Sequence, residues 1–426
     1  MGKKTSFILH LHPEQVPAST LRYTHTFGLG GMTALLILLQ ITTGILLRFV
    51  YVPSPAGAYD SILFLQREVP FGQFVRNIHH LGGVLLIVIS FLHLLRVFFT
   101  GAFHPPVRSG NWVIGLVMFL LIMSSNFTGY LLPWDQLSYW AVTVVTSMLG
   151  YIPVVGPSLT EWVRGGSEVN ASTLLTFFNF HTAVIPLTLI ILMVFHFWRV
   201  RRAGGVIPPR YAGEKDARMA DTVPHLVVRE LAVALVLLAV IFVLALFLDA
   251  PLRERANPAY SPNPAKAPWY FMGIQEMLMH FHPLLGAILL PLAFLTALFR
   301  LPWMRYSRKN QGILFYSEKG KKSALMSAVT ALLLTTLLIL ADEYWLHFNL
   351  WLPALPSFVS EGIFPLLLYA LLFAGYFYLI KKIYVPEPSE TVQAVFVFFL
   401  VTYTVLSLTG IFFRGPGMML MWTGML

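Results

Sequence analysis

The chain contains no cysteine and little charge. Without cysteine it can have no disulfide scaffold, thiolate metal site, iron–sulfur ligation or covalently attached c-type haem. Only 11% of its 426 residues are charged and 57% are hydrophobic, whereas a soluble domain carries roughly 25% charged residues. This leaves too little polar surface to cover a water-facing globule of this length. The sequence therefore predicts a membrane protein surrounded by lipid.

Long charge-free runs predict how often the chain crosses the membrane, since a crossing helix needs about 20 residues. Nine such runs occur, at 24–47, 77–95, 109–134, 169–198, 231–248, 277–299, 323–341, 362–380 and 391–413. A tenth run, 136–160, contains two glycines and two prolines, which predict a pair of short interfacial helices instead of a span. We therefore expect an all-α, polytopic transmembrane protein.

The basic residues are divided unequally between the two sides of these spans. With nine spans, the N-terminus shares its side with the even-numbered loops, and that side carries 21 of the 29 lysines and arginines. Cytoplasmic loops hold the excess of lysine and arginine in membrane proteins. We expect the N-terminus to be cytoplasmic, in a bacterial inner (plasma) membrane. The net charge of +10 then needs no nucleic-acid partner.

Four histidines lie inside the second and fourth predicted spans. His79 and His93 are 14 residues apart, and His181 and His196 are 15 apart, so each pair covers about 21–22 Å of helix and nearly four turns. The two spans run in the same direction, which puts His79 level with His181 on the outer side and His93 level with His196 on the cytoplasmic side. Facing imidazoles without thiolates are suited to two six-coordinate haem irons. The alternative is four hydrogen-bonded core histidines.

Two arginines and four glycines fit the same hypothesis. Arg76 lies three residues before His79, and Arg96 three after His93. Each could meet a haem propionate, or could be an ordinary arginine reaching from a helix end to the interface. Glycines 14 apart in the first and third spans would let a flat macrocycle approach the backbone, or would only pack helices. These are Gly30, Gly44, Gly115 and Gly129.

Four segments resemble cytochrome b of quinol–cytochrome c reductases, in its cytochrome b6-like form. They are Arg76-Asn77-Ile78-His79, His93-Leu94-Leu95-Arg96-Val97, Thr128-Gly129-Tyr130-Leu131-Leu132-Pro133-Trp134-Asp135-Gln136, and His181-Thr182 through Pro186 to His196-Phe197. The resemblance is close over about 20–205 and looser over 225–345. It implies a di-haem four-helix domain at 1–210, a subunit IV-like quinol-site domain at 211–345, and additional helices at 346–426. Gly28 occupies the place where the b6 branch has a cysteine that holds an extra haem.

The resemblance also implies ligands, substrate and partners. His79 and His181 would hold one non-covalent b-type haem, and His93 and His196 a second. The subunit would oxidise quinol, menaquinol or ubiquinol, at an outer site and pass electrons across the membrane with proton translocation. Its partners would be a Rieske-type iron–sulfur protein and a c-type cytochrome, in a homodimeric complex.

The chain departs from the family at the outer quinol site. Where the family has Pro-Glu-Trp-Tyr, this sequence reads Ala267-Pro268-Trp269-Tyr270, without the proton-accepting glutamate. Quinol oxidation releases protons, so we expect Glu276, the nearest following carboxylate, to be the substitute acceptor. Its alternative role is to cap the sixth span, and His280 and His282 are weaker candidates. Tyr270 could hydrogen-bond the quinone, or be an ordinary interfacial aromatic.

Two regions are less informative. A second quinone pocket on the cytoplasmic side would need polar groups, although most of the candidates are more typical of solvated loops. The candidates are Arg201, Asp221, His225, Arg229 and Glu230. The ninth span, 391–413, holds no ionisable residue and is typical of a packing or subunit-docking helix.

Two other functions fit parts of the pattern. One is a di-haem membrane anchor of a quinone-linked dehydrogenase, which would also place two haems between histidine pairs. The other is a proton-coupled secondary transporter, in which intramembrane histidines would relay protons. A transporter predicts broken helices and inverted repeats, and the histidine-bearing spans show neither.

Overall fold

The computed structural model describes residues 12–104, 106–209, 218–304 and 312–421. Within these residues, nine helices are long and apolar enough to cross a membrane. They are α3 (Leu29–Arg48), α5 (Gly72–Phe99), α6 (Ser109–Tyr130), α9 to α10 (Ala171–Arg202), η4 and α11 (Thr222–Phe247), η6 to η7 through α13 (Leu284–Trp303), α14 (Glu318–Tyr344), η9 and α16 (Phe358–Ile383), and α17 (Pro388–Phe412). The expected all-α, polytopic fold is confirmed.

These helices are apolar around most of their circumference, as lipid-facing helices must be. In α10 (Ile185–Arg202), Leu187 and Val194 are each 61% exposed while Leu189 is only 4% exposed. Backbone hydrogen bonds are satisfied inside each helix, so the apolar side chains are free to face lipid on one side and neighbouring helices on the other.

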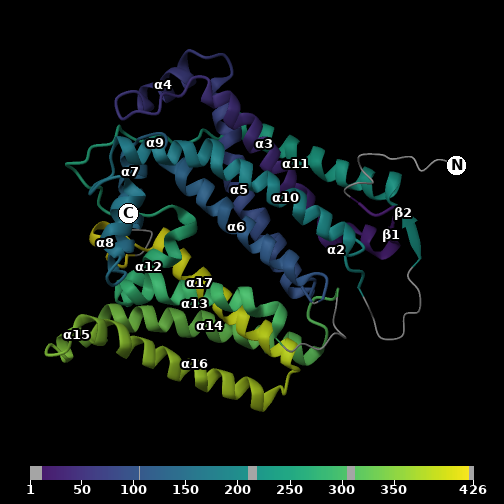
Figure 1. The fold of residues 1–426 in the computed structure, drawn as a ribbon. Helices are drawn as coiled ribbons and strands as arrows, with labels where there is room; N and C mark the ends of the chain where they lie inside the picture. Colours follow the sequence, from purple (N-terminus) through teal and green to yellow (C-terminus); the bar gives the residue numbers. More distant parts are fainter. Residues whose placement is uncertain (1–11, 105, 210–217, 305–311, 422–426) are drawn as a thin grey trace.

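The spans form two groups (Figure 1). In the first, α3 packs against α5, α5 against α6, and α6 against α10, while α11 (Val227–Phe247) adds to the α3–α5 face. Its core includes Leu36, Leu86 and Ile122, each at most 4% exposed. The second group contains α13 (Leu290–Arg300), α14, α16 (Phe364–Ile383) and α17, in which α14 and α17 are extensively packed.

Short elements gather at the two ends of the spans (Figure 1). One end carries α4 (Ala58–Arg67), α7 (Gln136–Ser147), α8 (Gly156–Arg164), α12 (Met272–His280) and α15 (Phe348–Trp351). The other carries α2 (Tyr23–Thr26) and a small antiparallel pair of strands, β1 (Gln15–Pro17) and β2 (Met219–Asp221). The two short helices predicted for 136–160 are present as α7 and α8.

Several predicted span boundaries were wrong, and the fifth span, for example, begins at Thr222 instead of residue 231. The first span begins at Leu29 instead of residue 24, because Phe27 and Gly28 both adopt left-handed backbone conformations, with φ of 52° and 66°, and separate α2 from α3. The sixth begins at Leu284 instead of 277, because Phe281 is extended and Pro283 follows it. Residues 272–280 therefore form a separate helix, α12.

Candidate functional site

The four span histidines come together as two pairs inside the first helix group. The ring centres of His79 and His181 are 6.0 Å apart, and those of His93 and His196 are 6.4 Å apart. A metal–imidazole bond is about 2 Å long, so two rings on opposite sides of one metal ion have centres about 6 Å apart. Both pairs therefore have the spacing of two ligands that share one six-coordinate iron.

Hydrogen bonds at the other ring nitrogen orient two of these imidazoles. Thr43 Oγ1 lies 2.8 Å from His79 Nδ1, and the Ser125 carbonyl lies 2.9 Å from His181 Nδ1. A partner at Nδ1 fixes the ring and leaves Nε2 for a metal. His196 Nδ1 is buried and has no partner among the described residues.

Each histidine faces one of the four predicted glycines across a helix–helix contact. A Cβ built on Gly30 would lie 3.2 Å from His93 Cε1, and one on Gly44 would lie 3.3 Å from His79 Cε1. In the other helix pair, a Cβ on Gly115 would lie 3.7 Å from His196 and one on Gly129 only 2.5 Å from His181. The glycines therefore make room for the imidazole rings between the helices, and their role beside a flat macrocycle stays a prediction.

A π-helical turn explains why histidine spacings of 14 and 15 are equivalent. In a regular helix 15 residues rotate a side chain about 100° further than 14 do. The turn η3 (Phe180–Val184) contains His181 and joins α9 (Ala171–Asn179) to α10. A π turn takes up one additional residue, so His181 and His196 face the same way as His79 and His93. The spacing of 15 was the only sequence signal of this turn.

The two arginines expected at haem propionates contact the protein itself. Arg76 is 7% exposed and donates hydrogen bonds to the carbonyls of Ala250 and Pro251, at 2.7 and 2.6 Å. Arg96 Nε donates to the His25 carbonyl at 3.4 Å. Arg76 thereby ties the segment after α11 to the start of α5, and its role at a propionate stays a prediction.

The Tyr270 side chain lies in the loop that leads into α12. Its ring is 9% exposed, and its buried hydroxyl has no hydrogen-bond partner among the described residues. Burial raises the pKa of Tyr270 above its ordinary value, which keeps the phenol protonated. Gln275 holds the loop against α12 through bonds to the Ala267 amide at 2.6 Å and the Ala265 carbonyl at 2.8 Å. The loop therefore holds the Tyr270 hydroxyl in a fixed place, where it can still donate a hydrogen bond.

Glu276 lies in a buried ion pair that the sequence did not predict. Its side chain is fully buried, and Arg414 holds both of its oxygens, with the shortest contact at 2.7 Å. Burial alone would raise the pKa of Glu276, but hydrogen bonds and charge from His280 and Arg414 lower it overall. The carboxylate is thus ionised and enclosed by these partners.

The ninth span supplies this arginine. Arg414 lies two residues beyond the end of α17, where a charge is normally solvated, yet it is 1% exposed. Within α17, the Tyr403 hydroxyl donates to the Tyr270 carbonyl at 3.0 Å. Ser407 Oγ lies 2.7 Å from the place that a Cβ on Gly273 would take. The helix expected only to pack or dock therefore forms one wall of the Tyr270 loop.

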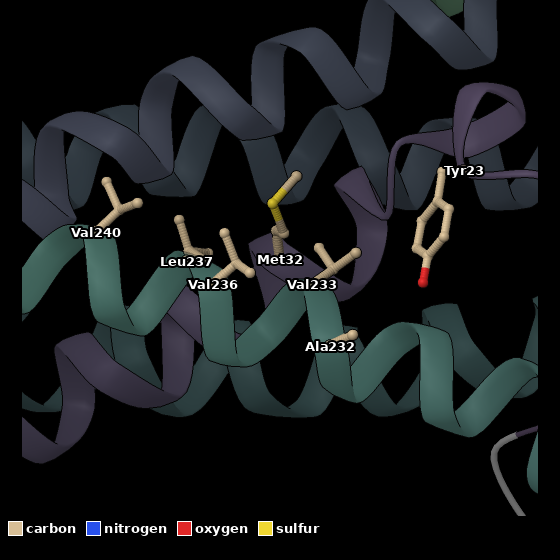
Figure 2. Close-up of a pocket in the computed structure, with 7 residues that line it drawn as sticks. All are labelled: Tyr23, Met32, Ala232, Val233, Val236, Leu237 and Val240. Atoms are coloured by element: carbon tan, nitrogen blue, oxygen red, sulfur yellow. The ribbon is translucent and has the colours of Figure 1, made fainter.

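The opposite end of the first helix group has an apolar groove of about 370 Å³ (Figure 2). Its lining consists of Tyr23, Met32, Ala232, Val233, Val236, Leu237 and Val240. The polar residues expected in a second quinone pocket contact other parts of the protein. Asp221 accepts a hydrogen bond from Gln15, and Arg229 donates one to the His225 carbonyl. The Glu230 carboxylate lies 3.4 Å from His12 Nε2. None of them lines this groove.

Known proteins match this chain over its histidine-bearing half and, in fold, over most of its length. The cytochrome b/b6/petB family matches residues 15–204. Cytochrome b6 of Heliomicrobium gestii is 43% identical over 193 residues, which are 45% of this chain and 88% of that protein. The cytochrome b subunit of menaquinol:cytochrome c reductase from Geobacillus thermodenitrificans is 41% identical over 196 residues, or 46% and 87%.

A solved structure, titled hyperthermophilic respiratory Complex III, shares the fold. It aligns with a TM-score of 0.65 at 24% identity, and the alignment covers 88% of this chain and 92% of that one. The fold similarity thus extends past the family match into the second helix group. The chain belongs to the cytochrome b/b6 family and is an integral-membrane, electron-transferring cytochrome that binds b-type haem.

Proposed function

We propose that the chain is the di-haem cytochrome b subunit of a membrane quinol–cytochrome c oxidoreductase. The observation that carries this proposal is the pair of histidine couples, each with the spacing of two ligands on one iron and each beside two glycines. His79 with His181 would hold one haem, and His93 with His196 the other. The similarity to the cytochrome b subunit of a menaquinol:cytochrome c reductase supports the reaction.

Three successive parts of the chain have different proposed roles. Residues 1–210 would hold the haems, residues 211–345 would form the outer quinol site, and residues 346–426 would add helices around it. The excess of basic residues on one side supports a cytoplasmic N-terminus in a bacterial inner membrane. The end of the fold that carries α12 is then the outer end (Figure 1).

The protein's own residues position the substrate and handle its protons. When bound, the two haems supply one-electron transfer across the membrane. The Tyr270 phenol would donate its unused hydrogen bond to a quinol oxygen, and the fixed loop orients it. Glu276 would receive the proton that leaves the quinol, in place of the glutamate missing at Pro268. Menaquinol and ubiquinol are both candidate substrates.

The partners follow from electron balance. A quinol gives up two electrons, and this chain has no cysteine with which to hold an iron–sulfur cluster. The first electron would therefore leave to a separate Rieske-type iron–sulfur protein and then to a c-type cytochrome. A homodimeric complex is part of the proposal.

Purification of the intact complex tests this function. We expect two b haems per chain by pyridine haemochrome quantitation, co-purification of a Rieske-type protein and a c-type cytochrome, and quinol-dependent reduction of cytochrome c. Two haems with neither partner, together with quinone reduction by an attached dehydrogenase, would instead identify a dehydrogenase anchor. A preparation without haem would refute both haem-based functions.

A further inference from the structure

Glu276, His280 and Asp342 form a line of titratable groups at the outer end of the second helix group. His280 Nε2 lies 3.3 Å from Glu276 Oε1, and His280 Nδ1 lies 2.7 Å from Asp342 Oδ2. Glu276 and His280 come from α12, and Asp342 from the last turn of α14. An ionised carboxylate only accepts hydrogen bonds, so a ring with a carboxylate at each nitrogen is an imidazolium that donates to both.

Exposure to solvent increases along this line. The Glu276 side chain is 0% exposed, that of His280 10%, and that of Asp342 26%. One end is therefore sealed inside the protein and the other reaches water. Neighbouring hydrogen-bonded groups of this kind can pass a proton from one to the next.

We propose that Glu276, His280 and Asp342 are a proton relay that carries the quinol proton from the buried outer site to the external solvent. This inference rests on the proposed function and adds the exit route to it. The quinol O–H bond breaks and Glu276 gains the proton. His280 then gives its Nδ1 proton to Asp342, which releases it to water, while the ring keeps its Nε2 proton. The neutral ring turns so that its bare Nδ1 faces Glu276 and takes the Glu276 proton, and the imidazolium then turns back. The relay ends as it began, with no net change in charge.

The surrounding charges hold the relay in its starting state. Arg414 binds Glu276 and also donates to Glu343 Oε2 at 2.7 Å. Lys266, which donates to the Ile411 carbonyl at 2.9 Å, interacts electrostatically with Glu276. With the imidazolium, the three cations of this cluster balance its three carboxylates. Burial would lower the pKa of His280, but the hydrogen bonds and charges of Asp342 and Glu276 raise it overall.

Adjacent carboxylates on α14 provide a matched pair of variants. Asp342→Asn removes the solvent end of the relay, whereas Glu343→Gln removes the same charge one residue away without touching His280. In the purified complex, with decylubiquinol and menadiol as probes, we expect Asp342→Asn to slow turnover roughly tenfold or more. Its solvent deuterium isotope effect should rise, and Glu343→Gln should keep the wild-type isotope effect.

Chemical rescue separates proton transfer from structural damage. Asp342 is partly exposed, so added formate, a small weak acid, can approach from the solvent side and accept the proton in place of the missing carboxylate. Formate should therefore restore turnover of Asp342→Asn, which a purely structural role would not allow. His280→Gln should be slow and not rescued, and haem content is measured for every variant. Equal turnover and isotope effects in Asp342→Asn and Glu343→Gln would overturn the relay, as would a slow Asp342→Asn that formate does not rescue. A wild-type complex with two haems that oxidises neither quinol would instead overturn the proposed function.

Discussion

Each proposed haem ligand has a facing imidazole and a nearby glycine, and two of the four also have a hydrogen bond that fixes the ring. His79 shows all three, with His181 opposite, Gly44 beside it and Thr43 at Nδ1. A histidine that served only as a buried core residue would need a hydrogen-bond partner, but neither a facing imidazole nor a nearby glycine. The glycine and the 6.0 Å distance between the ring centres both fit the proposed haem between the two rings.

Gly44→Val should remove the outer haem. The added side chain would start 3.3 Å from His79 Cε1 and extend into the space that a macrocycle needs. Gly31→Val is the control on the same helix, because a Cβ there meets nothing within 4 Å. Haem per chain should fall from two towards one for Gly44→Val and stay at two for Gly31→Val. Full haem content in Gly44→Val would contradict the assigned position.

Tyr270→Phe should separate function from stability. The hydroxyl is buried without a described partner, so its removal gives up no hydrogen bond and relieves the cost of burying a polar group. Thermal stability of the complex should stay the same or rise slightly. Quinol oxidation should fall, because the phenol is the proposed donor to the quinol oxygen. A variant with lower stability and unchanged turnover would show that the hydroxyl is structural.

At the level of whole elements, α12, α14 and α17 meet at one end of the fold through buried charge. Arg414 after α17 binds Glu276 of α12 and Glu343 of α14, while His280 joins α12 to Asp342 of α14. Removing one member of a buried ion pair costs about 3–5 kcal/mol, because the remaining charge is left unpaired. This junction fixes the helix that follows the Tyr270 loop.

The junction should make stability depend on pH with a defined sign. The pKa of Glu276 is lowered below its ordinary 4.5, so its contribution is present above pH 4.5 and is lost as pH falls through the lower folded value. The pKa of His280 is raised above 6.5, so its contribution is full below pH 6.5 and is lost as pH rises through the higher folded value. The Tm of the wild type should therefore be higher than that of His280→Gln. The difference in Tm should be largest between pH 4.5 and 6.5 and smaller at alkaline pH. A difference that grows with pH would refute this charge state.

At the scale of the whole molecule, the sequence predicted what depends on length, polarity and local spacing. The nine spans follow from charge-free runs. The depth of each histidine along its span follows from the number of residues between the two histidines. Three features depend on tertiary contacts and were missed: the π turn at His181, the separate helix α12, and the burial of Arg414. A charge next to a span is normally solvated, and only the packing of α17 against α12 and α14 shows that Arg414 is enclosed.

Removal of α17 should therefore affect the two halves of the molecule differently. A chain that ends at Val385 loses Arg414 and the Tyr403 contact to the Tyr270 loop, which leaves the Glu276 carboxylate without its principal partner. The bundle of α3, α5, α6 and α10 keeps its own core.

We expect the truncated chain in membranes to retain the reduced-minus-oxidised spectrum of b haem while losing quinol-dependent cytochrome c reduction. Arg414→Gln in the full-length chain is the companion variant, because it removes the charge and keeps the helix. It should impair quinol oxidation with less loss of stability than the truncation. Wild-type quinol oxidation in the truncated chain would show that α17 is only a peripheral helix, since the Tyr270 loop would then hold its geometry without this wall.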